Sequence, residues 1–359
     1  MKATITTTKL QEAVSRVAKG VGNNKLLPIT SLLGIESSDG SLCLTATDGT
    51  NYLYIKTDGI EGDDLNITIP ADVFIKLIGR MTSDETVLTL NEGTLTVSGN
   101  GKYTIELPLD ETGNLIKYPD PATSITINDR ASSISKSVVD AVIESIKPAL
   151  ATTFENPCYT GYYAGDRITA TDTYKIASLD AKLFDEPVLV SPAFLDLLSV
   201  MSQEEIKTYV DGNKVLCDTD DCRVYGVFMN GIEDYAIDAI SGLVDTEYDS
   251  MCVVPKQNLL QLLDRLALFV SPYDKNAVTL TFTQEGLLVS SKASRGTELI
   301  EYARVENFAD HKCSIDIEML RQEVKAMPSE QITIYYGSDT TIKLVDHAVT
   351  VIIALLEER

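Results

Sequence analysis

Side chains that could do chemistry are few in this sequence, and they are widely spaced. The chain has two histidines, His311 and His347, and no His-Glu-x-x-His arrangement that would place two zinc ligands on one helix face. It also lacks the Gly-x-x-x-x-Gly-Lys-Ser/Thr and Gly-x-Gly-x-x-Gly patterns whose glycines let the backbone approach phosphates. The residues therefore predict neither nucleotide hydrolysis nor a dinucleotide cofactor.

The densest group of possible metal ligands is the run from Cys217 to Cys222, which encloses three aspartates. A structural zinc site usually takes a second pair of ligands, and no such pair follows, so the run is more typical of a hairpin tip. The other cysteines have no regular spacing, and we expect all six to be small buried hydrophobes in a reducing compartment. We expect no metal, no cofactor and no enzymatic activity.

Composition limits the remaining function classes. The 359 residues are 44% hydrophobic, which is enough for packed cores and suggests two or three domains. No apolar run reaches the roughly 18 residues of a membrane span, and the first residues do not resemble a signal peptide, so we expect a cytoplasmic protein with no membrane contact. A net charge of −23 argues against coating nucleic acid by overall attraction.

Amphipathic helices must alternate with strands to build those cores. In the first helical pattern Leu10, Ala13, Val14 and Val17 share one arc, and charged residues occupy the opposite one. The helical segments are 8–20, 71–81, 134–150, 191–202, 255–269 and 316–327. Between them lie short β-rich stretches, with the tight-turn signals Asp39-Gly40, Asp48-Gly49 and Asp211-Gly212.

The same order of elements recurs along the chain. Thr45-Ala46-Thr47-Asp48 returns as Thr169-Ala170-Thr171-Asp172, 124 residues later. Helices start near 9, 136 and 256, and second helices start near 71, 193 and 317, which gives a period near 120. This period is too long for a solenoid unit and predicts three homologous domains, at 1–122, 123–245 and 246–359.

Charge is unevenly distributed over this plan. The three predicted domains carry net charges of −6, −11 and −6, but the six helical segments together hold 11 basic and 9 acidic residues. Everything outside the helices carries −25. The helices are therefore the least acidic surface that could face a phosphate backbone, although ordinary solvated helix faces would also fit these counts.

Short matches in a fixed order extend along nearly the whole chain. They are Met1-Lys2, Leu27-Pro28-Ile29, Gly34-Ile35, Leu44 to Asp48, Ile69-Pro70-Ala71, Tyr118-Pro119, Ala170-Thr171-Asp172 and Asp234-Tyr235. In these residues the sequence resembles the β sliding clamp family of bacterial DNA polymerase III. The resemblance implies an α+β fold of three repeated clamp domains, each with two helices packed on antiparallel sheets, and a homodimeric ring.

This resemblance also implies partners. A ring of this family encircles double-stranded DNA without reading its sequence, is loaded by a clamp loader, and tethers a replicative DNA polymerase. Weak, water-screened contacts to phosphates suit a ring that must slide. The expected DNA-contact residues are Lys9, Arg16, Lys19, Lys25, Lys76, Arg80, Lys136, Lys147, Arg265, Arg321 and Lys325.

By position in the family, partner peptides would bind an apolar cleft between the middle and last domains. Its residues here would be Tyr159, Thr171, Thr173, Tyr174, Lys175, Ile176, Tyr235, Ile237, Met319, Ala354, Leu355 and Leu356. Three departures affect it: Thr173-Tyr174-Lys175 replaces the usual Gly-His-Arg, Ile232-Glu233 replaces Phe-Pro, and Ala354 to Arg359 replaces the usual C-terminal pattern. Such departures would fit a clamp encoded by a phage or another mobile element.

The subunit boundary is expected near Leu268, because this leucine falls on the polar face of its helix. With Phe269 it resembles the family's pair at the dimer interface, and the partners would be Tyr103 and Ile105 on the edge strand 102–106. An exposed surface leucine is the alternative interpretation.

Other function classes fit these features less well. A β-rich structural or assembly protein of a virus would share the repeats and the acidity, but it would not need six amphipathic helices. A relative of the two-domain trimeric clamps would show two repeats and not three. A carbohydrate-active enzyme would need paired carboxylates beside an aromatic groove, and the chain has no tryptophan and no identifiable pair.

Overall fold

Two compact units make up the chain. The computed structural model describes residues 1–127, 131–153, 155–291 and 295–357. Unit 1 comprises Met1–Ser137 and Ala193–Phe228, and unit 2 comprises Val138–Pro192 and Met229–Arg359. The segment predicted as a middle domain therefore contributes to both units, and the boundaries proposed from the repeat stay a prediction.

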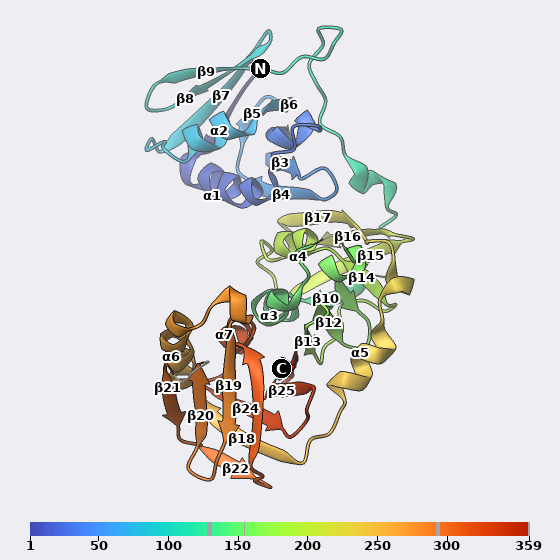
Figure 1. Ribbon diagram of the computed structural model, residues 1–359. Coiled ribbons are helices and arrows are strands. Elements are labelled where there is room, and N and C mark those ends of the chain that lie inside the picture. Colours follow the sequence, from blue (N-terminus) through green and yellow to red (C-terminus); the bar gives the residue numbers. More distant parts are fainter. Residues whose placement is uncertain (128–130, 154, 292–294, 358–359) are drawn as a thin grey trace. The chain divides into compact units, whose positions relative to one another are not determined.

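The predicted alternation of helices and strands is confirmed in the described residues, where one order occurs in three stretches (Figure 1). The first stretch is β1 (Lys2–Thr6), α1 (Thr7–Val17), β2 (Leu32–Ser38), β3 (Ser41–Thr47), β4 (Tyr52–Asp58), β5 (Glu61–Gly62), β6 (Leu65–Pro70), α2 (Ala71–Ile78), β7 (Glu85–Asn91), β8 (Thr94–Ser98) and β9 (Lys102–Glu106). The second is β10 (Ser132–Ser135), α3 (Lys136–Ala141), β11 (Tyr162–Ala164), β12 (Ile168–Thr171), β13 (Lys175–Leu179), β14 (Val188–Val190), α4 (Pro192–Leu198), β15 (Glu205–Asp211), β16 (Lys214–Asp218) and β17 (Cys222–Val227). The third is β18 (Ser250–Pro255), α6 (Lys256–Leu266), β19 (Ala277–Phe282), β20 (Leu287–Ser291), β21 (Thr297–Ile300), β22 (Arg304–Glu306), β23 (His311–Asp316), α7 (Ile317–Ala326), β24 (Gln331–Tyr336), β25 (Thr341–Asp346) and β26 (Val349–Ala354).

Unit 1 contains two antiparallel sheets. Their strand orders are β5-β1-β7-β8-β9 and β10-β15-β16-β17-β4-β3-β2-β6. In the larger sheet β17 pairs with β4, so that Val224 lies opposite Leu53, and both side chains are fully buried. Strands of the first and middle segments thus share one sheet and one hydrophobic core.

Unit 2 repeats this arrangement with the middle and last segments. Its sheets have the orders β14-β11-β12-β13-β26-β25-β24-β18-β22 and β21-β20-β19-β23. Here β13 pairs with β26, and Ile176 lies opposite Ile352. The register leaves β9 at one edge in unit 1 and β21 at one edge in unit 2.

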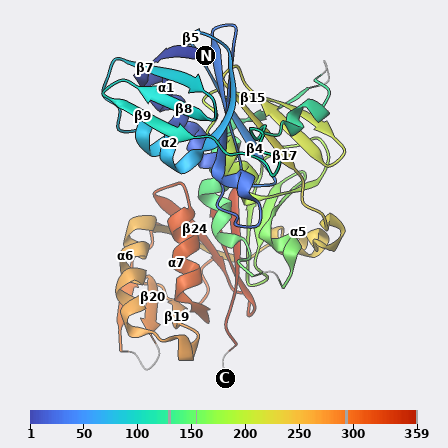
Figure 2. The same cartoon turned by 90° about the horizontal axis from the view of Figure 1, so that it is seen from above.

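Helices pair on the sheets within each unit. In unit 1, α1 buries Leu10, Ala13, Val14 and Val17, as the periodicity predicted. The Gln11 amide of α1 donates hydrogen bonds to backbone carbonyls at the end of α2, which joins the two helices. In unit 2, α6 and α7 run side by side (Figure 2). No helix in the described ranges is long and apolar enough to cross a membrane.

Two predicted segments differ from the structure. The pattern at 134–150 is a short α3 followed by a π-helical segment (Val142–Ile146) and a 3₁₀ turn (Lys147–Ala149), because Pro148 cannot donate a helical hydrogen bond. The predicted boundary between residues 245 and 246 directly follows a helix that was not predicted, α5 (Ile237–Val244), which packs against β13 and β26.

Candidate functional site

A hydrogen-bonded turn joins β12 to β13 in unit 2. The Thr171 hydroxyl donates to the carbonyl of Lys175 over 2.7 Å, and an Asp172 carboxylate oxygen accepts from the backbone N–H groups of Tyr174 and Lys175 at 3.0 and 2.9 Å. The turn directs the Tyr174 side chain outward, where 63% of it is exposed. Thr173 has a φ of 77°, a left-handed conformation that glycine adopts more easily.

The first copy of the repeated tetrapeptide forms the same turn between β3 and β4. The Thr47 hydroxyl donates to the carbonyl of Asn51 at 2.6 Å, and Asp48 accepts from the N–H groups of Thr50 and Asn51 at 2.8 Å. Gly49 occupies the position of Thr173, with a φ of 104°. The repeat therefore encodes a turn, as the sequence predicted, and its polar side chains are used within the turn.

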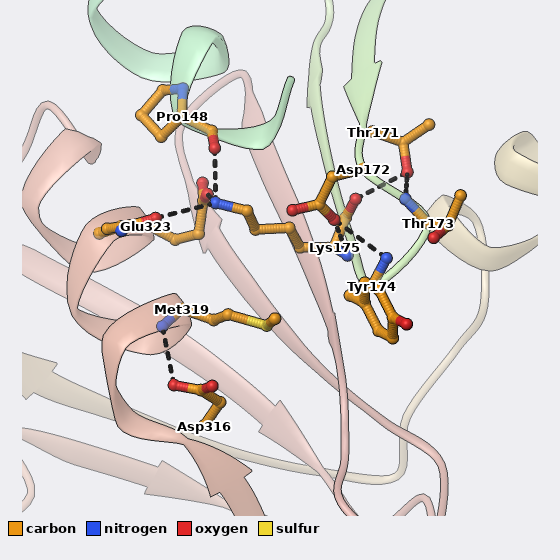
Figure 3. Close-up of polar contacts among 10 residues, drawn as sticks. Pro148, Thr171, Asp172, Thr173, Tyr174, Lys175, Asp316, Met319 and Glu323 are labelled. Atoms are coloured by element: carbon orange, nitrogen blue, oxygen red, sulfur yellow. Dashed lines mark hydrogen bonds and ion pairs between the residues drawn. The ribbon is translucent and has the colours of Figure 1, made fainter. Parts of the chain in front are cut away.

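Lys175 lies beneath the surface and forms a buried ion pair. Its Nζ is 2.9 Å from Oε1 of Glu323 on α7, it also donates to the carbonyl of Pro148, and the two charged side chains are 4% and 0% exposed. Figure 3 shows the Lys175 side chain extending from the turn to this carboxylate. Burial raises the pKa of Glu323, and the adjacent ammonium of Lys175 opposes that rise. Lys175 was expected to line the wall of the partner-peptide cleft. In the structure its side chain is buried below the turn and does not form part of the surface.

Aromatic and aliphatic side chains form a partly exposed surface beside this turn, which we call the tyrosine patch: Tyr159, Tyr163, Met229, Ile232 and Ile237. They pack on a buried cluster that contains Cys158, Ile176, Leu189, Tyr235, Ile240, Val244 and Ile352. The ring of Tyr235 lies 5.0 Å from that of Tyr159 and 5.3 Å from that of Tyr163, and its hydroxyl donates to the carbonyl of Thr169. Burial raises the pKa of Tyr235, so this hydroxyl stays protonated.

The predicted cleft residues separate into three groups. Tyr159 and Ile237 lie in the tyrosine patch, and Ile176 and Tyr235 lie in the buried cluster on which it packs. Thr171 and Lys175 are buried supports, whereas Thr173 and Tyr174 stand on the turn. Met319 on α7 and the half-buried residues Ala354, Leu355 and Leu356 lie outside the cluster that contains Tyr235.

The sequence did not predict three members of the tyrosine patch, namely Tyr163, Met229 and Ile232. The spacing of Ile237, Ile240 and Val244, at i, i+3 and i+7, is the signal that could have identified α5 and the side it buries.

The cysteine run forms a hairpin tip between β16 and β17, as predicted. Cys217 and Cys222 are buried free thiols, and burial raises the pKa of each to about 12, so neither is a reactive thiolate. Among the described residues, no three His, Cys, Asp or Glu side chains gather in a group that could hold a metal ion.

Comparisons with known proteins agree on one family. A model of the family described as DNA polymerase III beta subunit, N-terminal domain, matches residues 1–115. The beta sliding clamp of Chlamydia pneumoniae is 20% identical over 318 residues, which cover 82% of this chain and 81% of that protein. The DNA polymerase sliding clamp of Bacillus subtilis has the same fold, with a TM-score of 0.85, 19% identity and 100% of both chains covered. The beta subunit of Streptococcus pyogenes gives a TM-score of 0.86 at 17% identity, again over 100% of both chains.

Residues 1–115 match the family model, and the whole chain has the fold of these sliding clamps. The identity to these proteins is low, and the likeness in fold extends over the full length of the chain.

Four of the predicted DNA-contact residues are held in ion pairs. Arg16 pairs with Asp221 at 2.7 Å, Lys76 with Asp72 at 2.6 Å and Arg265 with Glu298 at 2.6 Å. Arg321 contacts both Asp264 and Glu318. Their positive charge is therefore partly neutralised on the protein itself.

Arg16 is the most enclosed of these four, with 19% of its side chain exposed. Burial alone would raise the pKa of Asp221, but the hydrogen bond and charge of Arg16 outweigh it and the pKa lies below its usual value. Arg16 therefore joins α1 to the β16–β17 hairpin inside unit 1.

The remaining predicted cations differ in their contacts. Lys9 donates to the carbonyl of Asp58, and Lys136 and Lys147 also make interactions. Lys19, Lys25, Arg80 and Lys325 are exposed, and no described residue forms an ion pair with them. These four are the cations most available to an external phosphate.

The predicted interface residues lie at or next to two of the sheet edges, β9 and β21. Leu268 is 80% exposed and Phe269 49% exposed, in the 3₁₀ turn that follows α6. On β9, Tyr103 is 43% exposed, but Ile105 is only 5% exposed. Ile105 therefore packs into its own unit, because its side chain points to the opposite face from its strand neighbours, and only its backbone lies at the edge.

Proposed function

We propose that this chain is a β sliding clamp, which encloses duplex DNA as a ring of two copies and tethers a replicative DNA polymerase to it, without catalysing a reaction. The observation that carries the proposal is the threefold order of elements, which matches sliding clamps of known structure over the whole chain. A clamp loader would open the ring, and no nucleotide-binding motif is needed on the clamp itself.

Ring closure is proposed to occur between β9 of one copy and β21 of the other. Both strands are sheet edges with unpaired backbone groups, and pairing them would continue a sheet from one copy into the next. Leu268, Phe269 and Tyr103 would supply the apolar contact. A head-to-tail arrangement of this kind uses two different surfaces and closes when the rotation between copies allows it.

Topological retention tests the proposal without a known loader. Linear DNA with biotin at both ends is mixed with the clamp, and streptavidin is added either before or after the protein. We expect salt-resistant retention only when streptavidin is added afterwards, because a ring must thread over an open end. Retention that does not depend on this order, or none in either order at micromolar protein, would reject an encircling ring.

A further inference from the structure

A cavity lies at one end of the strands in the last segment of unit 2, and we call it the Tyr336 cavity. Its volume is about 330 Å³, at the lower end of the range for small-molecule sites. Its walls are the ends of β18, β23 and β24 with the loops next to them, formed by residues 246–250, 309–311 and 336–338. All of these residues belong to unit 2, so the cavity is complete within that unit.

Tyr336 brings a buried hydroxyl to the wall of this cavity. The residue is 1% exposed, and its ring stacks on Phe282 of β19 with 3.8 Å between the ring centroids. Among the described residues, no group forms a hydrogen bond with the hydroxyl. Burial raises the pKa of Tyr336, and Ala309 and Ser250 lie near enough to oppose that rise but without the geometry of a hydrogen bond. Because an unpaired buried hydroxyl costs free energy, a ligand that bonds to it would gain affinity.

His311 supplies a second unused polar atom. It is the first residue of β23 and lies opposite Phe282 in the pairing of β19 with β23. Its ring centroid is 6.2 Å from those of Phe282 and Tyr336, and its Nε2 is buried without a hydrogen-bond partner in the described part of the chain. A neutral imidazole that carries its proton on Nδ1 accepts a hydrogen bond at Nε2. Two acceptors from two strands therefore face one cavity.

Other polar groups of the lining are used within the protein. Four hydroxyls already form hydrogen bonds with residues outside the lining, namely those of Thr246, Tyr248, Ser250 and Ser338. The Tyr336 hydroxyl and Nε2 of His311 thus differ from the hydroxyls around them, and they are the lining atoms that a ligand could engage without breaking an existing bond.

The charge of the wall is negative. Three carboxylates line the cavity, Glu247, Asp249 and Asp310, and its described lining contains no Lys or Arg. Lys343 lies next to the lining, but its ammonium donates to two backbone carbonyls at and just after the end of α5, at 2.7 and 3.1 Å. Negative charge around a recess favours a cationic occupant.

We propose that the Tyr336 cavity binds a small organic cation, a compound with a primary ammonium or guanidinium group. Its N–H groups donate to the Tyr336 hydroxyl and to Nε2 of His311, and the carboxylates balance its charge. A metal ion fits less well, because within the described ranges no three His, Cys, Asp or Glu side chains gather in a group that could hold one. This site does not depend on ring formation, so it goes beyond the proposed function.

Histidine ring signals in nuclear magnetic resonance test the proposal on the full-length chain. The chain has two histidines, and His347 lies in the β25–β26 turn at the opposite end of the sheet, with 82% of its side chain exposed. Protein with isotope-labelled histidine is titrated at fixed pH with butylguanidinium, with the neutral butylurea of similar shape, and with magnesium chloride. We expect butylguanidinium to move the His311 signal and leave that of His347 in place.

The affinities should follow charge. Butylguanidinium should bind about 10-fold more tightly than butylurea, because hydrogen bonds from a charged donor are roughly twice as strong as neutral ones. Magnesium chloride should leave the His311 signal unchanged. Equal affinity for the two organic compounds, no movement of the His311 signal with either, or movement with magnesium alone would overturn the inference.

Tyr336→Phe removes the hydroxyl alone. It should weaken the binding of butylguanidinium by about 10-fold, whereas thermal stability should not fall, since the hydroxyl forms no hydrogen bond within the described protein. Tyr335→Phe removes a hydroxyl from the other face of the same strand and should leave binding unchanged. Unchanged binding in Tyr336→Phe would contradict the assignment of this hydroxyl.

A second pair of variants tests the carboxylates. Asp249→Asn combined with Asp310→Asn should reduce the preference for butylguanidinium over butylurea several-fold, because each exposed charge pair changes affinity by roughly 1.4- to 5-fold. Asp180→Asn combined with Glu330→Gln removes two exposed charges at the opposite end of the same sheet and should leave the preference unchanged. Equal effects of the two double variants would show that the lining carboxylates do not select the ligand.

Discussion

At the residue scale, the two Thr-Asp turns combine one shared hydrogen-bond pattern with different residues at the left-handed position. The sequence predicted both turns, because threonine and aspartate side chains bond to the backbone within a few residues. It could not predict that Lys175, the residue after the second turn, is buried. The partner of that lysine, Glu323, lies on a helix 148 residues away, and no local pattern links the two.

Breaking this buried pair should strongly destabilise unit 2. In Lys175→Met, Glu323 would be left buried and unpaired, and we expect the free energy of unfolding to fall by about 3–5 kcal/mol. Replacing both residues, as in Lys175→Met with Glu323→Met, should restore most of it, since an apolar pair leaves no buried charge. Urea unfolding of the two variants and the wild type measures both effects. Equal losses in the single and double variants would contradict the argument.

The single variant should also acquire a distinct dependence on pH. Burial raises the pKa of Glu323 in the folded protein, and removal of Lys175 takes away the charge that opposes the rise. The folded state then holds a proton more tightly than the unfolded state, so stability is greatest at low pH and falls as pH rises above the ordinary carboxylate pKa. Unfolding of Lys175→Met measured from about pH 5 to pH 8 should show a steeper decline than the wild type. A parallel pH profile would argue against a buried Glu323.

Exchanging the residue types at the left-handed position of the two turns, Thr173 and Gly49, tests whether backbone strain affects stability. Thr173→Gly should stabilise the protein by roughly 0.5–1 kcal/mol, because a β-branched residue at a φ of 77° is strained and glycine is not. The opposite exchange, Gly49→Thr, should destabilise by about 1–2 kcal/mol, since the added side chain would also crowd Leu27. Thermal unfolding of both variants checks the signs, and the same sign for both would exclude the conformational explanation.

At the element scale, hydrophobic periodicity predicted the paired helices, because the apolar residues of each helix lie on one side along its whole length. The pattern was weaker at α5, which was not predicted and which contains Gly242 and the exposed Leu243. Strand existence was predictable from β-rich runs, and the resemblance placed one sheet edge at 102–106, but the other edges were not predictable. Edge position depends on pairings such as β13 with β26, whose residues are far apart in the chain.

The exposed end of α6 should control assembly. Replacing Leu268 and Phe269 together by alanine is expected to give a folded monomer in sedimentation at nanomolar concentration, because large apolar groups next to a free sheet edge usually mark an interface. Val73→Ala with Val210→Ala removes exposed apolar groups of 52% and 51% exposure at other places and should leave the dimer intact. A dimer in the first variant would place the subunit contact elsewhere.

At the scale of the whole molecule, the repeat was visible in the sequence but the compact units were not. Local turn and helix signals recur with a period near 120, whereas the grouping into units follows from β17–β4 and β13–β26 pairing across the middle segment. A similar limit applies to charge. The sequence indicated the helices as the least acidic elements, but counting could not tell that Arg16 and Arg321 are paired with Asp221, Asp264 and Glu318.

The difference between paired and unpaired cations allows a test of which residues contact DNA. Lys19, Lys25, Arg80 and Lys325 have no ion-pair partner among the described residues, so a phosphate could approach them without displacing a carboxylate. Changing all four to glutamine should lower the slope of log affinity against log salt on duplex DNA by up to about 0.9 for each phosphate that the variant no longer neutralises.

Arg16→Gln provides the contrast, because its side chain is 19% exposed and tied to Asp221. Its main effect should be on the stability of unit 1, and the salt slope should change little. A chain of net charge −23 can hold DNA only weakly through four such groups, which is the condition a sliding ring requires. Should Arg16→Gln alone reduce the slope as much as the fourfold variant, the paired cations would be the ones that face DNA.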